Sequence, residues 1–384
     1  MRITMFAPQR RARCGIRDYT DLLLAHLRNI PDITEIATVS PDPMETPWGL
    51  ARSVLRYAPE ERRYHALGRA MNTGDIAHVQ HQYFFFGGVA PHRNHARAFY
   101  AALRVPLVLT VHEIVSPEAQ RSALTRHLVA LANRQNFLHP AIRACIVHTE
   151  QDAQSLQALG IPADRITRIP HGTPPPCALP DAQTARQRLE CQGRFVVTLF
   201  GFLSAKKGHA LALEALAAMP PDTLLLLAGD RHPDDRTDYV ARLKATIAQH
   251  NLTDRVRITG YLPVDEIPWV MAATDAGIAP YTQTSGSGSL ANLLAYGRAV
   301  VASDIPPHRE IAAASPTPLR LFRAGDAQDL ARQLRTLREN VAERMALQQA
   351  ALAYARSHSY ARMAQETVAV YRRLLAESDH AHCH

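Results

Sequence analysis

The chain has 384 residues, of which 47% are hydrophobic and 20% charged, and its formal net charge is +8. A chain of this length is too long for one ordinary hydrophobic core, so we predict two domains. No apolar run approaches the roughly 20 residues that span a bilayer. The five cysteines are scattered without a Cys-x-x-Cys pair, so the sequence indicates neither a disulfide framework nor a zinc site. The N-terminus predicts a strand rather than a signal peptide, and the expected location is the cytoplasm.

The basic surplus is concentrated in the first half of the chain. Residues 1–176 contain 20 Arg, no Lys and 14 Asp plus Glu, a surplus of 6. A solvated surface is one explanation, and attraction to phosphate-bearing substrates or to the inner face of a membrane is another. We therefore expect peripheral, reversible attraction of the first domain to anionic membrane surfaces or to a phosphate-bearing acceptor. No helix-turn-helix, zinc finger or aromatic RNA-binding motif accompanies the charge, so nucleic acid is not an expected partner.

The first half alternates short apolar segments with amphipathic ones. This alternation predicts a parallel sheet with helices on both faces. The proline-rich segment from His171 to Pro180 disfavours helix and predicts an extended connector, so the expected first domain is 1–176. The predicted strands are 3–7, 33–39, 76–80, 107–111 and 144–148, and the predicted helices include 16–27, 92–103 and 122–137.

The same alternation resumes in the second half, giving an expected second domain of 177–357. Residues 327–378 are almost wholly helical, and the last helix, from Tyr360, is expected to return to the first domain as 358–384. Two such domains in tandem face a cleft, and their ligands bind beyond the carboxyl ends of the strands. The predicted strands are 195–200, 224–228, 256–259, 276–279, 299–302 and 319–322.

The stretch 281–311 is the centre of the predicted chemistry. Its loop alternates serine and glycine and leads into a short helix, 290–296. Glycines allow a ligand to approach the backbone, and the start of a helix offers unpaired amide groups to an anion. The alternative is a capped core helix after a flexible turn. The loop residues are Ser285, Gly286, Ser287, Gly288 and Ser289.

Three loops of the first half follow predicted strands. The first is arginine-rich and includes Arg13 and Gly15, which precedes a helix, so it suits phosphate but is also an ordinary exposed loop. The second begins at His81 and continues with an aromatic run that suits either an acceptor or the core. The third begins at His112, either a site residue or a buried, hydrogen-bonded histidine. The aromatic run contains Tyr83 and Phe84.

Two of the chain's three lysines, Lys206 and Lys207, occupy one strand-to-helix turn. A lysine beside a helix start supplies positive charge for a leaving diphosphate. The glycine spacing does not match a Walker loop. No Asp-x-Asp occurs in the sequence, so no metal site is expected.

In order, these motifs resemble a retaining glycosyltransferase with the GT-B fold, of the large family numbered four that includes the glycogen-synthase and mannosyltransferase-like group. The resemblance implies two Rossmann-like, doubly wound parallel-sheet domains facing a cleft. It extends through most of the chain. The matching segments are the Gly15 loop, His112, Ile169-Pro-His-Gly172, Leu203-Ser-Ala-Lys-Lys-Gly208, Gly260-Tyr-Leu262, the Ser/Gly loop, Ala295-Tyr-Gly-Arg-Ala-Val-Val301 and Ser359-Tyr with Tyr371.

The resemblance also implies roles for individual residues. His112 and Lys207 correspond to the catalytic histidine and the diphosphate lysine, and Arg13, His81, Tyr83 and Phe84 are the expected acceptor-binding residues. The nucleoside-diphosphate sugar is a substrate, and no cofactor or metal is implied. The acceptor would be a glycan, a lipid-linked molecule or a small molecule. The expected donor-binding residues are Gly15, Phe202, Lys206, Tyr261, Leu262, Thr284, Ser285, Gly286, Ser287, Gly288, Ser289 and Asn292.

The chain departs from the family pattern at three positions. Phe202 stands where an arginine is common, and Thr284 and Asn292 stand where the family has two glutamates. Asn292 can still bond a ribose hydroxyl, whereas Thr284 supplies no carboxylate. The leading hypothesis is metal-independent, retaining transfer of a sugar to a hydroxyl. The alternatives are a GT-B phosphorylase or epimerase, and a degenerate protein that binds a sugar nucleotide or scaffolds a partner.

Overall fold

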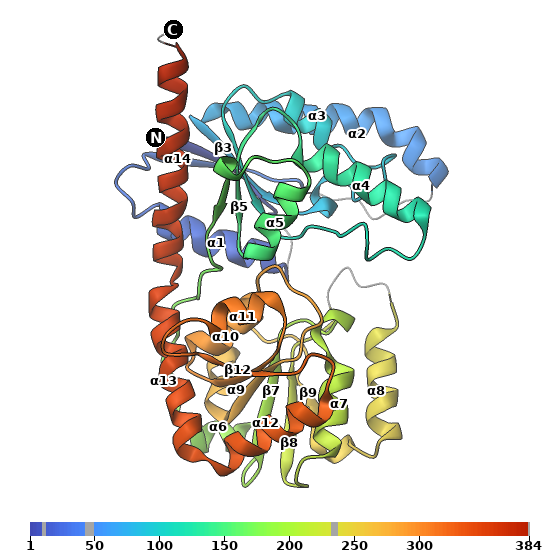
Figure 1. Ribbon diagram of the computed structural model, residues 1–384, viewed down its shortest axis with the longest axis vertical. Coiled ribbons are helices and arrows are strands. Elements are labelled where there is room, and N and C mark those ends of the chain that lie inside the picture. The colour runs from blue at the N-terminus through green and yellow to red at the C-terminus, as the bar shows by residue number, and fades with distance from the viewer. Residues whose placement is uncertain (10–12, 43–49, 232–236, 383–384) are drawn as a thin grey trace. The chain divides into compact units, whose positions relative to one another are not determined.

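The computed structural model describes residues 1–9, 13–42, 50–231 and 237–382, without the side chains of 50–55 and 378–382 (Figure 1). The chain divides into two compact units. The junction lies at Pro170/His171 rather than after residue 176, because Thr173 belongs to the second unit. Its amide donates to the carbonyl O of His358 at 2.8 Å, and its hydroxyl donates to that of Ala355 at 2.6 Å. Unit 1 is Met1–Pro170 with Tyr360–His384, and unit 2 is His171–Ser359.

Unit 1 is built on a six-stranded parallel sheet in the order β2-β1-β3-β4-β5-β6. Its strands are short and largely buried, as expected for a sheet covered on both faces. The order reverses between β1 and β3, and ligands of doubly wound sheets bind at such a switch point. The strands are β1 (Arg2–Phe6), β2 (Glu35–Val39), β3 (Ile76–His81), β4 (Leu107–Val111), β5 (Ile142–Val147) and β6 (Ile166–Arg168).

In the described part of unit 1, two helices cover one face of this sheet and four pack on the other. On the first face, α1 (Gly15–Leu27) lies beside α14 (Tyr360–His382), the C-terminal helix (Figure 1). The apolar side of α14 packs into the same core as Tyr19 and Leu23 of α1, so the last helix is an integral part of unit 1. The other helices are α2 (Leu50–Ala70), α3 (Ala96–Ala101), α4 (Ala123–Phe137) and α5 (Glu150–Ala158), with 3-10 turns at Met71–Thr73, Tyr83–Phe86 and Ala163–Arg165.

Unit 2 contains a second six-stranded parallel sheet, in the order β12-β11-β10-β7-β8-β9. Its order reverses between β7 and β10, which places the switch point at the carboxyl ends of these two strands. The strands are β7 (Phe195–Phe200), β8 (Thr223–Ala228), β9 (Val256–Ile258), β10 (Ala276–Ala279), β11 (Ala299–Ser303) and β12 (Leu319–Phe322).

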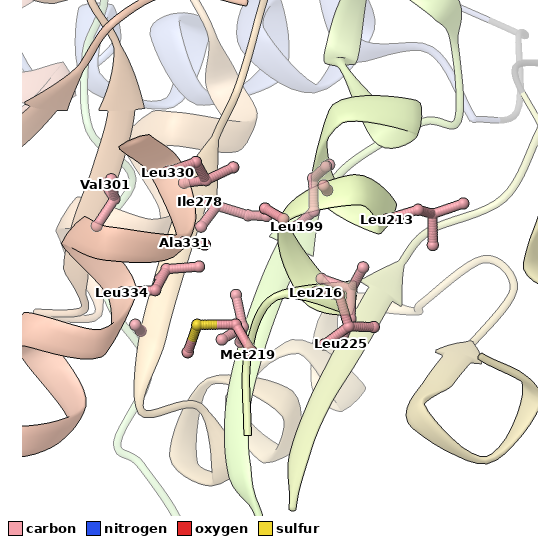
Figure 2. Close-up of a cluster of buried hydrophobic side chains, with 14 of the residues drawn as sticks. Leu199, Leu213, Leu216, Met219, Leu225, Ile278, Val301, Leu330, Ala331 and Leu334 are labelled. Carbon is pink, nitrogen blue, oxygen red and sulfur yellow. The ribbon is translucent and has the colours of Figure 1, made fainter. Parts of the chain in front are cut away.

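The helices of unit 2 also form two layers. One core joins the sheet to α7, α8 and α12, where Leu199 and Ile278 meet Leu216 and Leu334 (Figure 2). The opposite face is covered by α6, α9, α10 and α13. The helices are α6 (Ala182–Arg188), α7 (His209–Ala217), α8 (Tyr239–Gln249), α9 (Ile267–Ala273), α10 (Gly288–Ala295), α11 (Pro306–Ala312), α12 (Ala327–Glu339) and α13 (Val341–Ser357), with 3-10 turns at Ala205–Lys207, Thr253–Arg255 and Val264–Glu266.

Sequence patterns did not indicate every element. The long helix α2 contains Pro59, a residue that normally ends a helix, and β6 is only three residues long. Within the described residues, no helix combines the length and the apolar character needed to cross a bilayer.

Candidate active site

The switch point of unit 2 brings the two predicted donor loops together. The connection after β7 carries Lys206 and Lys207, and the connection after β10 carries the Ser/Gly loop. The two loops are joined through the backbone, because the amide of Thr282 donates to the carbonyl O of Lys206 at 3.0 Å. Residues that are far apart in the sequence therefore form one small region.

Two glycines allow this close approach. Gly201 has a φ of 112°, and a Cβ atom there would overlap Oγ of Ser289. Gly208 has a φ of 73°, and a Cβ atom there would overlap the carbonyl O of Pro280. Both values lie in the left-handed region that favours glycine. Glycine is therefore required at both positions, because of the backbone conformation and because of the close contact between the loops.

Lys207 is held by neutral groups. Its Nζ donates to Oγ of Ser289 at 3.2 Å and to Oγ of Ser287 at 3.4 Å, and it lies 4.0 Å from the ring centre of Tyr281. Tyr281 is buried and fixed in the core, so it forms a rigid base for the half-buried lysine. No carboxylate among the described residues forms an ion pair with Lys207. Its positive charge is thus available to an anion.

The start of α10 lies at the same place. Ser287 is the N-cap residue, and its Oγ accepts from the amide of Leu290 at 3.2 Å. The first turn of a helix has unpaired N–H groups and the positive end of the helix dipole. Because Oγ of Ser287 also contacts Lys207, the helix start and the ammonium group converge on one point. The arrangement is suited to a phosphate group.

The two residues that replace the family's glutamates, Thr284 and Asn292, stabilise this loop. The hydroxyl of Thr284 donates to the carbonyl O of Gly286 at 2.9 Å and lies 3.3 Å from the amide of the same residue. The side-chain amide of Asn292 donates to the carbonyl O of Gly288 at 2.8 Å. In this structure both side chains therefore brace the loop and the first turn of α10.

The remaining predicted donor residues of unit 2 lie on the connections after β7, β9 and β10. Phe202 and Ser285 are half-buried, and Lys206 is exposed. Tyr261, with 39% of its surface exposed, and Leu262 follow β9. β8 separates β9 from β7, so these two residues lie further along the same edge of the sheet.

Two buried histidines lie near the lysine. Burial lowers the pKa of His209 and of His308 to about 4, and the positive charge of Lys207 acts in the same direction. Nδ1 of His308 lies 2.8 Å from the carbonyl O of Ser303, and its ring is 5.5 Å from that of Tyr281. Both histidines are therefore neutral at physiological pH and add no competing charge.

In unit 1, His112 lies directly after β4. Its Nε2 is 2.8 Å from Oε1 of Gln80, and the edge-on ring of Tyr19 lies 4.8 Å away. The ring of His148 is 5.7 Å from it. His112 is half-buried, so it is supported from the protein side while keeping some exposed surface.

The structure places two predicted acceptor residues in the core. His81 is fully buried and its Nε2 lies 2.9 Å from Oδ1 of Asn136, while the hydroxyl of buried Tyr83 donates to Oδ1 of Asn133 at 2.5 Å. Both side chains are buried, and each has one of its polar atoms bound to an asparagine of α4, so direct contact with an acceptor is disfavoured for both. Phe84 is half-buried at the 3-10 turn after β3. The sequence alone could not show that Phe84 is more exposed than the aromatic residues beside it.

The arginine-rich loop is described only in part, because Arg10 and Arg11 lie outside the described residues. Arg13 is exposed and has a φ of 58°, and Gly15 begins α1. A Cβ atom on Gly15 would meet no described atom within 4 Å. The start of this helix is therefore sterically open where it is described.

Two residues were not identified as site residues from the sequence. Tyr281 forms the base beneath Lys207, and Gln80 contacts His112. The sequence did contain one indication that Gln80 has a role. A buried strand of apolar residues rarely carries polar side chains two positions apart, as His78 and Gln80 do. Among the described residues, no group of three or more His, Cys, Asp or Glu side chains could hold a metal ion.

Each half of the chain matches a glycosyltransferase family model. Residues 23–175 match the model for Glycosyltransferase Family 4, and residues 181–353 match Glycosyl transferases group 1. The 2-deoxystreptamine glucosyltransferase of Streptomyces kanamyceticus is 28% identical over 251 residues. This alignment covers 62% of the chain and 62% of the length of that relative.

Solved structures share the whole architecture. HepE of Anabaena in complex with UDP and glucose has a TM-score of 0.73 at 20% identity, covering 97% of this chain and 100% of that chain. The sucrose-phosphate synthase of Thermosynechococcus elongatus has a TM-score of 0.79 at 17% identity, covering 98% and 99%.

The paired sheets and these neighbours define a GT-B protein. With glycosyltransferase models matching both halves, the chain belongs to the GT-B glycosyltransferases of the family-four group, which are transferase enzymes. The GT-B fold and the family-four group that the motifs indicated are confirmed.

Proposed function

We propose that the protein transfers a sugar from a nucleoside diphosphate to an acceptor hydroxyl, with retention of configuration and without a metal ion or cofactor. The bond between the anomeric carbon and the diphosphate breaks, and the diphosphate leaves with the electron pair. A bond from the acceptor oxygen to the anomeric carbon forms, and the hydroxyl proton is released to a phosphate oxygen or to water.

The observation that carries this proposal is the position of Lys207. Negative charge develops on the leaving diphosphate, and fixed positive charge nearby lowers the barrier. Lys207 and the first turn of α10 converge on one point, and no described carboxylate neutralises the ammonium. These two groups can do the work that a metal ion or the arginine missing at Phe202 does in other enzymes.

We propose a UDP-sugar as the first donor to test, because HepE, a protein of the same fold, was solved with UDP and glucose. The relative from Streptomyces kanamyceticus is named a glucosyltransferase, which makes glucose the first sugar to test. In this proposal unit 2 binds the donor. Retention is proposed from the family resemblance.

Unit 1 would bind the acceptor, and its charge bears on what that acceptor is. The helix α4 contains Arg126 and Arg134 and no Asp or Glu, and Leu124 at its start has 69% of its surface exposed. Exposed Arg62, Arg69 and Arg97 lie on α2 and α3, which pack together on the same face of the sheet. This positively charged face suits a phosphate-bearing acceptor, or a lipid-linked acceptor at an anionic membrane surface, better than it suits a cationic acceptor.

The test compares two lysine variants with labelled nucleotide sugars and the purified full-length protein. Because loss of one preorganised donor costs on the order of 10²–10³ in rate, Lys207→Met should reduce transfer, or donor hydrolysis, by at least that factor. Lys244→Met is the matched control, since Lys244 is exposed on α8. If the protein binds a sugar nucleotide but neither transfers nor hydrolyses it, and Lys207→Met binds equally well, the catalytic proposal fails. The degenerate binding protein then becomes the better interpretation.

A further inference from the structure

A row of polar side chains crosses the sheet of unit 1 on the face that α1 and α14 cover. Side chains alternate along strands, so His78 and Gln80 of β3 point to the same face. Gln80 pairs with Thr110 of β4, and His112 continues that strand's alternation. Polar groups are costly in such a core unless they are hydrogen-bonded, so the contacts within this row are informative.

Gln80 is fully buried and has a partner for each end of its amide. Oε1 lies 2.8 Å from Nε2 of His112. The amide nitrogen lies 3.3 Å from Sδ of Met5 and 3.5 Å from Nε2 of His78. These neighbours come from β1, β3 and the end of β4, so the amide is held by three parts of one sheet.

Met5 determines which way the amide faces. A thioether sulfur accepts hydrogen bonds and cannot donate them, so the NH₂ group of Gln80 belongs beside it. The carbonyl oxygen of Gln80 must then face His112. A carbonyl oxygen only accepts, so the ring nitrogen facing it, Nε2, must carry a hydrogen.

We propose that Gln80 is a positioning residue that holds neutral His112 in its Nε2–H form, so that Nδ1 carries the lone pair. His112 would then accept a hydrogen bond from a sugar or acceptor hydroxyl through Nδ1 rather than donate one. The consequence for catalysis rests on the proposed function, whereas the protonation form of the ring does not.

Two further rings pack against His112. The edge of Tyr19 from α1 and the ring of His148 after β5 limit its rotation. Glu113 is the adjacent carboxylate in the chain, and its Oε2 accepts from the side chain of Gln82 at 2.9 Å.

The first experiment measures the protonation form directly. Protein labelled with ¹⁵N-histidine would be studied by NMR, and His112 would be identified among the 19 histidines by comparison with His112→Gln. We expect the shifts of a single Nε2–H form. Gln80→Met should give a mixture of the two forms, while Gln151→Met, at an exposed position on α5 of the same unit, should leave the shifts of His112 unchanged. An Nδ1–H form in the wild-type protein, or unchanged shifts in Gln80→Met, would overturn the assignment.

The second experiment uses catalysis. Gln80→Met should lower kcat by about fivefold to tenfold, the factor that corresponds to the loss of one ordinary hydrogen bond. It should leave the Kd of UDP unchanged, because UDP binding is assigned to unit 2. Gln80→Glu keeps an acceptor for Nε2–H but favours a second proton on Nδ1, so kcat should fall at neutral pH and recover as the pH rises. Tyr19 and His148 pack against His112 and Glu113 follows it in the chain, and these three groups are unchanged in the comparison. An active Gln80→Glu enzyme with no pH shift would refute the role of Nδ1, whereas an inactive wild-type protein with the Nε2–H form would refute only the proposed function.

Discussion

A Cβ atom on Gly201 would overlap Oγ of Ser289, and the same hydroxyl accepts from the ammonium group of Lys207. The absence of a side chain at Gly201 therefore allows the lysine to reach the Ser/Gly loop. The contact links the ends of β7 and β10, the two strands at the switch point of unit 2.

Gly201→Ala should consequently reduce both stability and activity. We expect a loss of about 1–3 kcal/mol in the free energy of unfolding, from the left-handed backbone and the overlap, and at least a tenfold loss of turnover. Denaturant unfolding and the transfer assay measure the two effects. Gly193→Ala is the control, since Gly193 also has a positive φ, of 68°, but a Cβ there meets no described atom within 4 Å. Equal effects of the two substitutions would show that the overlap is unimportant.

The two serines that contact Lys207 should differ in their effects. Ser287 also caps α10, so Ser287→Ala should cost about 1 kcal/mol of stability and weaken donor binding. Ser289→Ala removes a contact with Lys207 without removing a cap, so it should reduce turnover and leave the free energy of unfolding within about 0.5 kcal/mol. Thermal unfolding and donor titration separate the two cases. Identical behaviour of the two variants would contradict these distinct roles.

The hydroxyl of Tyr371 on α14 lies 2.5 Å from Nδ1 of His78 on β3, and both side chains are fully buried. Tyr371→Phe should destabilise the protein by about 1–3 kcal/mol because it leaves a buried ring nitrogen without a partner. The cost should be smaller when the same change is made in a His78→Leu background, where that nitrogen is already absent. Denaturant unfolding of the four proteins gives this coupling. Additive effects would mean that the hydrogen bond does not stabilise the position of α14.

The architecture was predictable because strand and helix periodicities are local. The turn containing Lys207 and the Ser/Gly loop were also recognisable, since their residue types are unusual: two of three lysines at one turn, and alternating serine and glycine. The burial of His81 and Tyr83 was not predictable, because one strand end offers the same residues to the core and to solvent. The role of Gln80 depends on Met5, which lies far away in the chain and becomes its neighbour only through the pairing of β1 with β3.

The arginine-bearing face of unit 1 should bind anionic surfaces. Vesicles containing phosphatidylglycerol should retain the protein at low salt and release it at higher salt, because charge attraction is screened within roughly 8 Å at physiological ionic strength. Arg126→Glu combined with Arg134→Glu should weaken binding, while Arg356→Glu, exposed on α13 of unit 2, should have little effect. Sedimentation with vesicles measures both. The proposal fails if binding is absent at low salt or if all variants bind alike.

Stability should decrease in mild acid because buried histidines resist protonation. Burial lowers the pKa of His78 to about 3 and that of His308 to about 4. Below the unfolded-state pKa of about 6.5, the unfolded chain therefore binds protons that the folded chain does not, and folding becomes less favourable as the pH falls toward 4. Each such group contributes about 1.4 kcal/mol per pH unit between its folded-state and unfolded-state pKa values, and nothing above the unfolded-state pKa.

Denaturant unfolding at pH 7.5 and 5.5 should show the loss of stability. His78→Gln should reduce the difference between the two pH values, whereas His65→Gln, at an exposed position on α2, should leave it unchanged. The same pH dependence in His78→Gln and in the wild-type protein would exclude His78 as a contributor.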